Sequence, residues 1–148
     1  MKRYLGVAIM LLLIGRYGPA FADNISVSGN PSALIVNSTT AGSDLIAAMD
    51  ATTTYRIETT TGNKKITGAI NSAMPANTSL KVTLTAPTGA FSMLDITLTV
   101  TAKDLVIGID NGTKESGLSI SYEFSATVEA GVVSMSSKTV TFTIVDSS

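Results

Sequence analysis

Strict alternation of apolar and polar residues is the feature that most constrains the fold of this chain. From Leu118 to Val128, every second side chain is apolar, and Ser, Thr or Glu stands between them. A period of two residues puts the apolar side chains on one face of a β-strand. The pattern recurs in residues 80–85, 94–101 and 139–144. It is typical of antiparallel sheets that bury one face and hydrate the other.

Further strand candidates lie beside short turn sequences. They are residues 25–29, 33–37, 55–59, 65–71 and 104–109. Turn sequences such as Asn30-Pro31 and Gly62-Asn63 separate them. Short strands with short turns predict an all-β chain, in particular a single immunoglobulin-like antiparallel β-sandwich of about seven to nine strands. Residues 43–49 break the pattern and are compatible with one or two helical turns, a loop or a distorted strand.

Residues 1–22 have the three parts of a secretory signal peptide. Lys2 and Arg3 form a basic start, residues 5–15 are apolar, and Ala20-Phe21-Ala22 is an A-x-A cleavage pattern. The apolar run is far shorter than the roughly 20 residues that span a bilayer, so a membrane anchor is the weaker alternative. We therefore expect residues 1–22 to be removed and residues 23–148 to form one domain without a membrane span. The mature chain is expected to be secreted, either periplasmic or extracellular at the cell surface.

The charge balance bears on the partners of the mature chain. Removal of residues 1–22 takes away Lys2, Arg3 and Arg16, which leaves seven basic residues against eleven acidic ones and a net charge of −4. This sign and the lack of a basic cluster argue against nucleic acid and anionic lipid as partners. Charged residues make up 14% of the chain, so its strand edges carry few of the charges that discourage pairing between molecules. We expect protein partners: other subunits or surface components, copies of the chain itself among them.

The chain lacks the residues on which most catalytic sites depend. It contains no His, no Cys and no Trp. This composition excludes Ser-His-Asp and Cys-His catalysis, imidazole or thiolate metal ligands, and disulfide bonds. Two carboxylates suffice for a glycosidase, but the acidic residues here lie mostly on hydrated strand faces or in turns, where no burial raises their pKa. The sequence therefore predicts no enzymatic activity and no cofactor, with a carboxylate-only hydrolase as the least favoured alternative.

One group of residues is a candidate calcium site. Asp104, Asp110, Asn111 and Glu115 supply the oxygen ligands that calcium prefers, close together in sequence around Gly112. Their spacing is not that of an EF-hand loop. An ordinary Asx turn, which needs no metal, is the preferred interpretation.

Two aromatic residues are candidates for a ligand platform. Sugar-binding faces commonly offer exposed aromatic side chains, and the mature chain has few aromatic residues. Tyr55 and Phe91 are the ones that lie outside the apolar stripes described above. Core or edge packing is the preferred role for each, because both have large apolar rings.

The C-terminal half carries strings of residues that resemble a group of known proteins. They are residues 74–80 (MPANTSL), 86–89 (APTG), 120–133 (ISYEFSATVEAGVV) and 139–144 (TVTFTI). In these strings the chain resembles small secreted bacterial β-sandwich proteins of immunoglobulin-like type. The resemblance implies a secreted sandwich and assigns a role to no residue.

Fimbrial subunits of the chaperone–usher type are a looser comparison. They are also small, Thr-rich, secreted sandwiches, but they carry a disulfide and a C-terminal strand motif with Gly and Tyr. This chain has no Cys and ends in residues 143–148 (TIVDSS). The comparison implies that residues 24–37 could extend the sheet of a neighbouring molecule by β-augmentation. Pairing within their own domain is the preferred interpretation.

These observations favour an exported, non-enzymatic structural or adhesion-type protein that acts through strand edges and loops and assembles with itself. The alternative is an extracellular or periplasmic module that binds a glycan or another small ligand. An exposed patch around Tyr55 or Phe91 would favour the binding module.

Overall fold

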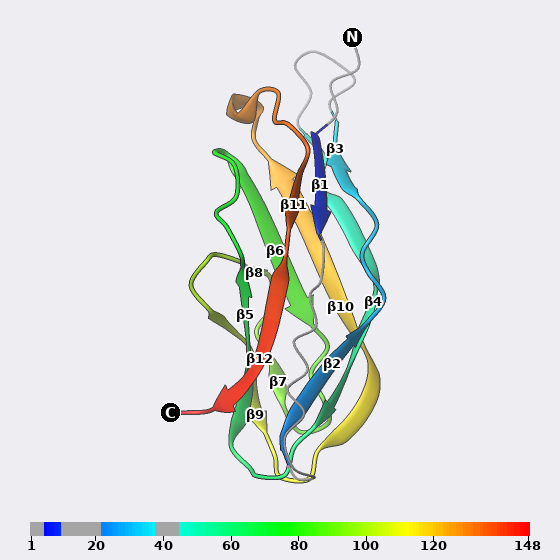
Figure 1. The fold of residues 1–148 in the computed structure, drawn as a ribbon, viewed down its shortest axis with the longest axis vertical. Helices are drawn as coiled ribbons and strands as arrows, with labels where there is room; N and C mark the ends of the chain where they lie inside the picture. Colours follow the sequence, from blue (N-terminus) through cyan, green and yellow to red (C-terminus); the bar gives the residue numbers. More distant parts are fainter. Residues whose placement is uncertain (1–4, 10–21, 38–44) are drawn as a thin grey trace.

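The computed structural model of the chain describes residues 5–9, 22–37 and 45–148 (Figure 1). These residues form strands joined by turns, with one short 3-10 helix and no α-helix. The elements are β1 (Leu5–Ile9), β2 (Asn24–Ser28), β3 (Leu34–Val36), β4 (Ala48–Glu58), β5 (Lys64–Ile70), β6 (Thr78–Leu84), β7 (Phe91–Ser92), β8 (Ile96–Thr97), β9 (Lys103–Ile109), β10 (Lys114–Ala126), η1 (Val128–Ala130), β11 (Ser136–Lys138) and β12 (Val140–Asp146).

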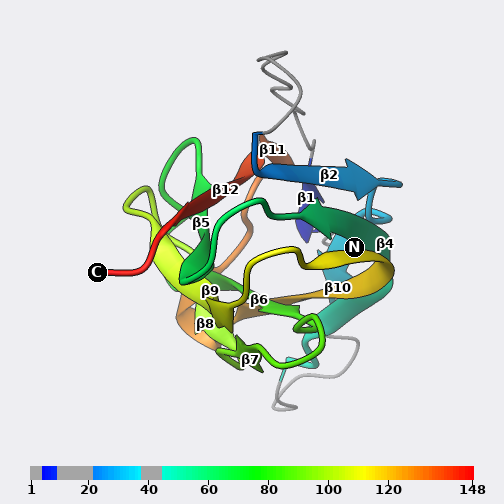
Figure 2. The same ribbon diagram turned by 90° about the horizontal axis from the view of Figure 1, so that it is seen from below.

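Two antiparallel sheets make up most of the fold (Figures 1 and 2). One sheet has five strands in the order β2-β4-β10-β6-β8, and the other has four in the order β12-β5-β9-β7. Every pairing within these two sheets is antiparallel. The prediction of an all-β chain is confirmed, and the two antiparallel sheets are consistent with a β-sandwich.

The core is built from the alternating segments. Ile120, Tyr122 and Phe124 of β10 are fully buried, and so are Leu80 and Leu84 of the neighbouring strand β6. The Ser, Thr, Lys and Glu residues between them stay partly exposed. The four-stranded sheet contributes Ile66, Ile70, Leu105, Val106, Ile109 and Val140. The predicted alternation is therefore confirmed for these two strands, where one face is buried and the other is hydrated.

The predicted strand over residues 94–101 is wrong for most of its length. Only the two residues of β8 form a strand there, although the Leu98 N–H donates to the Leu80 carbonyl at 2.9 Å. Leu94 and Val100 are 68% and 58% exposed. Asp95 takes a left-handed backbone conformation with a φ of 54°. Its N–H donates to the Thr83 hydroxyl at 3.0 Å, which turns the chain just before β8. Alternation cannot reveal such a local turn, because it reports only which side chains suit a strand.

Two further segments differ from the simplest expectation. β10 ends at Ala126, and Val128 opens η1 with 67% of its surface exposed, so the buried stripe stops short of its predicted end. In the irregular segment, residues 45–47 have no regular structure and Ala48-Met49 start β4. This favours the loop and strand interpretations there, while Ser43 and Asp44 lie outside the described residues. No helix in the described part of the chain is long and apolar enough to cross a membrane.

A third, smaller sheet lies at the end of the molecule where β10 finishes (Figure 1). Its order is β11-β1-β3. β1 runs antiparallel to β3 and parallel to β11. In the chain, β3 follows β2 after Asn30-Pro31, and β11 directly precedes β12. β1 therefore bridges the extensions of the edge strands of the two main sheets.

β1 belongs to the segment that the sequence assigns to a signal peptide. Of the other residues in this segment, Ala22 is described, whereas residues 1–4 and 10–21 lie outside the described residues. Cleavage after Ala22 and export both stay predictions.

Candidate functional site

β3 and β11 are the two walls of a space that β1 fills, which we call the β3–β11 gap. Among the described residues, β1 is the only strand hydrogen-bonded to either wall. Gly6 lies opposite Ile35 on one side, and Ala8 lies opposite Ser137 on the other. Strand backbone without a partner presents unpaired N–H and C=O groups that readily accept another extended chain. Within the part of the chain that the structure describes, both walls therefore have one short segment as their backbone partner.

The β3 wall is apolar. Leu34 and Val36 belong to the core, where they are 2% and 4% exposed. Ile35, between them, is 39% exposed. A strand with three consecutive apolar residues has both faces suited to burial. This wall therefore favours an apolar neighbour.

The β11 wall is polar and incompletely satisfied. The Ser136 hydroxyl oxygen is buried and has no hydrogen-bond partner among the described residues. Lys138 is 6% exposed, and its ammonium group donates to the Ser72 hydroxyl at 2.8 Å and to the Ala73 carbonyl at 2.6 Å. None of the ion pairs in the described part of the chain includes Lys138. Burial of a charge without a counter-charge costs free energy, so this wall favours a polar or acidic neighbour.

Asp50 holds the turn that leads into β3. Its carboxylate accepts the N–H of Ser32 at 3.2 Å and both the N–H and the hydroxyl of Thr52, at 3.0 and 2.8 Å. Burial raises the pKa of Asp50, but these hydrogen bonds favour the charged form and together bring the pKa below its ordinary value. The turn between β2 and β3 is thereby tied to β4, so β1 is not the only element that positions the β3 wall.

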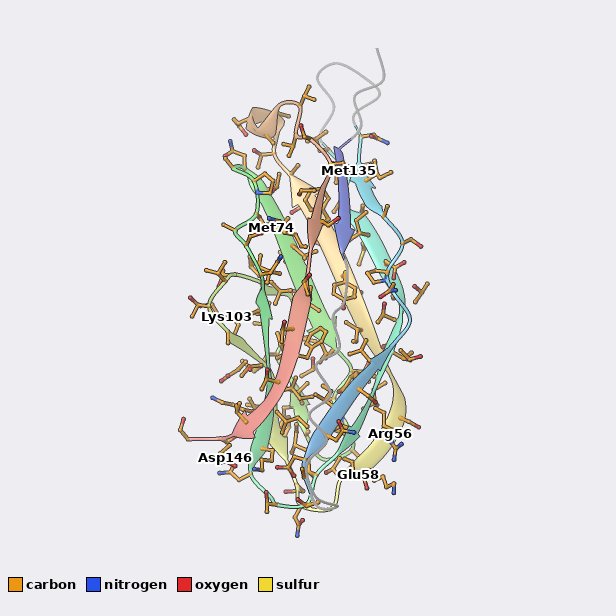
Figure 3. The ribbon with its side chains drawn as sticks, viewed as in Figure 1. Arg56, Glu58, Met74, Lys103, Met135 and Asp146 are labelled. Carbon is orange, nitrogen blue, oxygen red and sulfur yellow. The ribbon has the colours of Figure 1, made fainter. Side chains whose placement is uncertain are left out.

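Exposed apolar side chains gather at the end of the sandwich that holds the gap. Ile46 and Met49 lie at the start of β4, which pairs with the end of β10. Val128 and Val132 lie in and after η1, and Met135 directly precedes β11. These five side chains, which we call the apolar end, are 62% to 81% exposed. Figure 3 places Met135 beside β1, β3 and β11. Clusters of this kind are typical of interaction surfaces.

Charges tie the residue that precedes β2 to the C-terminal strand at the opposite end of the sandwich, where Figure 3 labels Asp146. Lys64 of β5 pairs with Asp146 and, at 2.9 Å, with Asp23. Hydrogen bonds to these two carboxylates raise the pKa of Lys64. Asp23 also accepts the N–H of Thr60 at 2.7 Å. Asp23 immediately precedes β2, which pairs with β4 of its own domain. The preferred interpretation of the N-terminal strand is therefore confirmed for β2.

Two of the calcium candidates are engaged with other groups. Asp104 on β9 pairs with Lys65 at 3.1 Å. Glu115 on β10 accepts the N–H of Thr88 at 2.7 Å. Across the described ranges, no three His, Cys, Asp or Glu residues are grouped as metal ligands would be. The structure thus gives Asp104 and Glu115 different partners on different strands.

The other two calcium candidates, Asp110 and Asn111, lie in the turn between β9 and β10 and are exposed. The Asp110 carbonyl accepts hydrogen bonds from the hydroxyls of Thr59 at 2.7 Å and Thr113 at 2.9 Å. These bonds close the turn through its backbone. The geometry supports the interpretation of this segment as a structural turn.

The two candidate aromatic residues lie in different environments. Tyr55 on β4 is 1% exposed, and its hydroxyl donates to the Thr85 carbonyl. Burial, with a smaller effect of the nearby Glu115 charge, raises the pKa of Tyr55. Core packing is confirmed for Tyr55, which removes it from any exposed platform. Phe91 on β7 is 68% exposed and lies against Gly108, where an added Cβ would be 3.5 Å from the ring.

Comparison of the chain with protein-family models, with curated proteins and with solved structures finds no match. The sequence predicts a strand at residues 33–37, within the segment 24–37 that is expected to pair in its own domain or to extend a neighbour's sheet, but it predicts no strand at β11. The apolar triplet of β3 is the signal that marks a strand in need of neighbours on both faces.

Proposed function

We propose that this chain is an exported, non-enzymatic structural or adhesion-type protein that acts through strand edges and loops and assembles with copies of itself. The observation that carries this proposal is the apolar end. Exposed apolar side chains are unfavourable in water, and association between molecules removes them from it. The signal-peptide pattern supports export. The low content of charged residues supports pairing at the strand edges.

The proposal includes an immunoglobulin-like type for the sandwich. In constant-type immunoglobulin domains one sheet has the strand order A-B-E-D, and the other contains C, F and G. The order β2-β4-β10-β6 corresponds to A-B-E-D, and the neighbours β12 and β5 correspond to F and C. In this correspondence β7, β8 and β9 are additional strands between D and E. The place of strand G, beside β12, holds no strand of the two main sheets in the described residues.

Light scattering of the protein purified from its secreting host tests the proposal. We expect mass spectrometry to place the N-terminus at Asp23, and light scattering with electron microscopy to show oligomers or filaments. Val132→Ser combined with Met135→Ser should shift the association toward monomer. Phe91→Ser combined with Leu94→Ser is the matched control, because it removes as much exposed apolar surface elsewhere. A chain that stays monomeric at every concentration and binds no cell surface contradicts the proposal.

A second candidate function is a glycan-binding or small-ligand-binding module, favoured by the exposure of Phe91 and of Leu94, which is also 68% exposed. A ring open to solvent can stack on the apolar face of a sugar. A glycan array probed with the secreted chain and with Phe91→Ala tests it. Binding that survives the substitution would remove this surface from consideration.

A further inference from the structure

We propose that Phe91 and Asp110 form a binding site for one neutral hexose of a glycan, which we call the sugar site. The inference rests on the second candidate function and deepens it, because it names the groups that hold the sugar and the class of sugar that they accept. It is carried by three features that lie together: an exposed ring, a carboxylate that none of the other described residues engages, and two glycines that leave the surface between them open.

The end of β9 presents its outer side next to Phe91. β7 is the edge strand of the four-stranded sheet (Figure 2), and Phe91 lies opposite Ile107 of β9. Ile109 is fully buried, whereas Gly108 before it and Asp110 after it are exposed. Gly108 and Asp110 therefore face away from the core, on the side of the sheet that Phe91 borders.

Residues 89–91 touch this outer side at two points. A Cβ added to Gly108 would be 3.5 Å from Cδ2 of Phe91, so one edge of the ring lies against the glycine. A Cβ added to Gly89 would be 3.7 Å from Oδ2 of Asp110. The two contacts are two residues apart along the chain, which is at most about 7 Å. The ring and the carboxylate therefore lie within reach of a single hexose.

The two glycines keep the sugar site open. Gly89 and Gly108 have φ values of 84° and 72°, a conformation that residues with a side chain rarely adopt. Neither position therefore places a side chain between the ring and the carboxylate. Phe91 is 68% exposed, so its ring is held at one edge and keeps most of its surface free to meet a ligand.

The chemistry of these groups fits a sugar. The backbone carbonyl of Asp110 closes the turn, but its carboxylate makes no hydrogen bond or ion pair with another described residue. A carboxylate is an acceptor, and its two oxygens can take the protons of two adjacent hydroxyl groups. The C–H face of a hexose stacks on an aromatic ring. A sugar supplies both partners in one molecule, whereas a purely apolar ligand would leave the carboxylate without one.

The loop that carries Gly89 is ordered before a ligand binds. The N–H of Thr88 donates to the Glu115 carboxylate at 2.7 Å, and the N–H of Ala90 donates to the Pro87 carbonyl at 3.0 Å. Pro87 itself is buried. A loop that is already fixed loses little conformational freedom on binding, which favours affinity.

The charges around the sugar site favour a neutral sugar. Glu115 contacts Thr88, the neighbour of Gly89, so its carboxylate and that of Asp110 lie at the same loop. The ammonium group of Lys114 is paired with Glu58. An acidic sugar would bring a third negative charge to this loop and be repelled. We therefore expect neutral hexoses to bind and sialylated ends to be rejected.

A glycan array tests the site with the secreted, processed chain. The probes are glucose-terminated oligosaccharides, and galactose-terminated oligosaccharides in their free and sialylated forms. The chain is expected to bind neutral probes, and sialylation should abolish the binding. A chelator should leave the binding unchanged, because the carboxylate contacts the sugar without a metal ion.

Two pairs of variants locate the contact. Asp110→Asn should weaken binding about tenfold or more, because a hydrogen bond to a charged group is lost. Asp146→Asn is its matched control, since it removes an exposed charge from β12 at the other edge of the same sheet. Phe91→Ala should weaken binding roughly three- to tenfold through the lost stacking. Leu94→Ala is the control for this change, because Leu94 has the same exposed fraction of 68%.

Nuclear magnetic resonance of the parent chain adds a measurement that needs no variant. Methyl galactoside and methyl glucoside are the probes. The backbone amide signals of Gly89 and Gly108 should shift with the sugar that the array selects, whereas those of β2 should not.

The outcomes separate this inference from the functions proposed above. Binding of neutral probes that falls in both site variants and in neither control supports the sugar site. Glycan binding that survives both site variants overturns the sugar site and leaves a glycan-binding function elsewhere on the chain standing. A preference for sialylated probes, or loss of binding in chelator, overturns the neutral, metal-free contact. Absence of any glycan binding overturns this inference together with the second candidate function, and leaves self-assembly to be judged by light scattering.

Discussion

Gly68→Ala should destabilise the protein, because the added methyl group has no room. Gly68 lies in β5, which is flanked by β12 and β9. A Cβ at this position would stand 2.5 Å from Cδ1 of Leu105 and 3.4 Å from Cδ2 of Leu98. The two leucines are 0% and 2% exposed, so neither can move into solvent to make space.

The expected magnitude follows from two effects of opposite sign. Overpacking a closed core costs about 1–3 kcal/mol. Without a clash, replacing a glycine inside a strand by alanine would stabilise the fold by about 0.5–1 kcal/mol. The cost of the clash outweighs this gain, so the free energy of unfolding should fall by about 1–2 kcal/mol.

Urea unfolding followed by circular dichroism measures this change. With a typical slope of about 1–3 kcal/mol per molar urea, the midpoint should fall by roughly 1 M. Gly62→Ala is the matched control, because the nearest atom, the backbone nitrogen of Asn111, is 3.4 Å from its added Cβ. Leu105→Val removes the clashing Cδ1 and should recover part of the loss in the double variant. A Gly68→Ala protein as stable as the parent would show that the core around Leu105 is not closed.

Three further predictions concern the fold and its turns. Because the pKa of Asp50 is lowered, its charged carboxylate stabilises the fold above the ordinary pKa of 3.8, and this stabilisation is lost as the pH falls below that value. In Asp50→Asn, the free energy of unfolding measured in urea should therefore change less with pH in this acidic range. Burial raises the pKa of Tyr55 and Tyr122, so their contribution to stability is present below pH 10 and is lost above it. Residues 23–148 contain no other tyrosine, so in a chain processed after Ala22 phenolate absorbance should appear only together with unfolding. Phe124→Ala should cost about 3–5 kcal/mol, whereas Phe91→Ala should change stability by less than about 0.5 kcal/mol, and equal losses in urea would contradict this assignment of core and edge.

A calcium titration checks the turn between β9 and β10. Because Asp104 pairs with Lys65 and Glu115 accepts the Thr88 N–H, adding calcium or a chelator should leave the Tm unchanged. A clear rise in Tm with calcium would favour the metal-site interpretation over the structural turn.

The core strands could be predicted because their signal is local. In β10, the alternation of Ile120, Tyr122 and Phe124 with polar residues predicts which face of the strand is buried, and the structure confirms it, because all three side chains are fully buried. The same reasoning failed at Leu94 and Val100, where the alternation is as regular but a turn at Asp95 interrupts the strand. Side-chain periodicity describes a strand's two faces, whereas the turn is set by backbone hydrogen bonds that the pattern does not contain.

The two candidate ligand residues also show what the sequence can predict and what depends on the tertiary structure. Tyr55 and Phe91 looked alike in sequence, as aromatic residues outside the regular stripes. The structure buries Tyr55 in β4 and leaves Phe91 open on the edge strand β7. Tyr55 belongs to the core cluster and lies on β4, which is flanked by β2 and β10. Phe91 lies on β7, an edge strand whose partner among the described residues is β9. A strand's place in the sheet decides how much of it is buried, and that place depends on contacts far apart in the chain.

The order of amino acids alone specifies the all-β class, the two best core strands and the lack of the groups that most catalytic sites require, because these follow from composition and from a period of two residues. The three-dimensional arrangement was needed to learn which strands are neighbours, which edges are open and that β3 and β11 share β1 as their backbone partner. The reason is that strand pairing joins backbone groups of segments distant in sequence. Backbone groups are nearly the same in every residue, so their partners cannot be read from the order of the side chains.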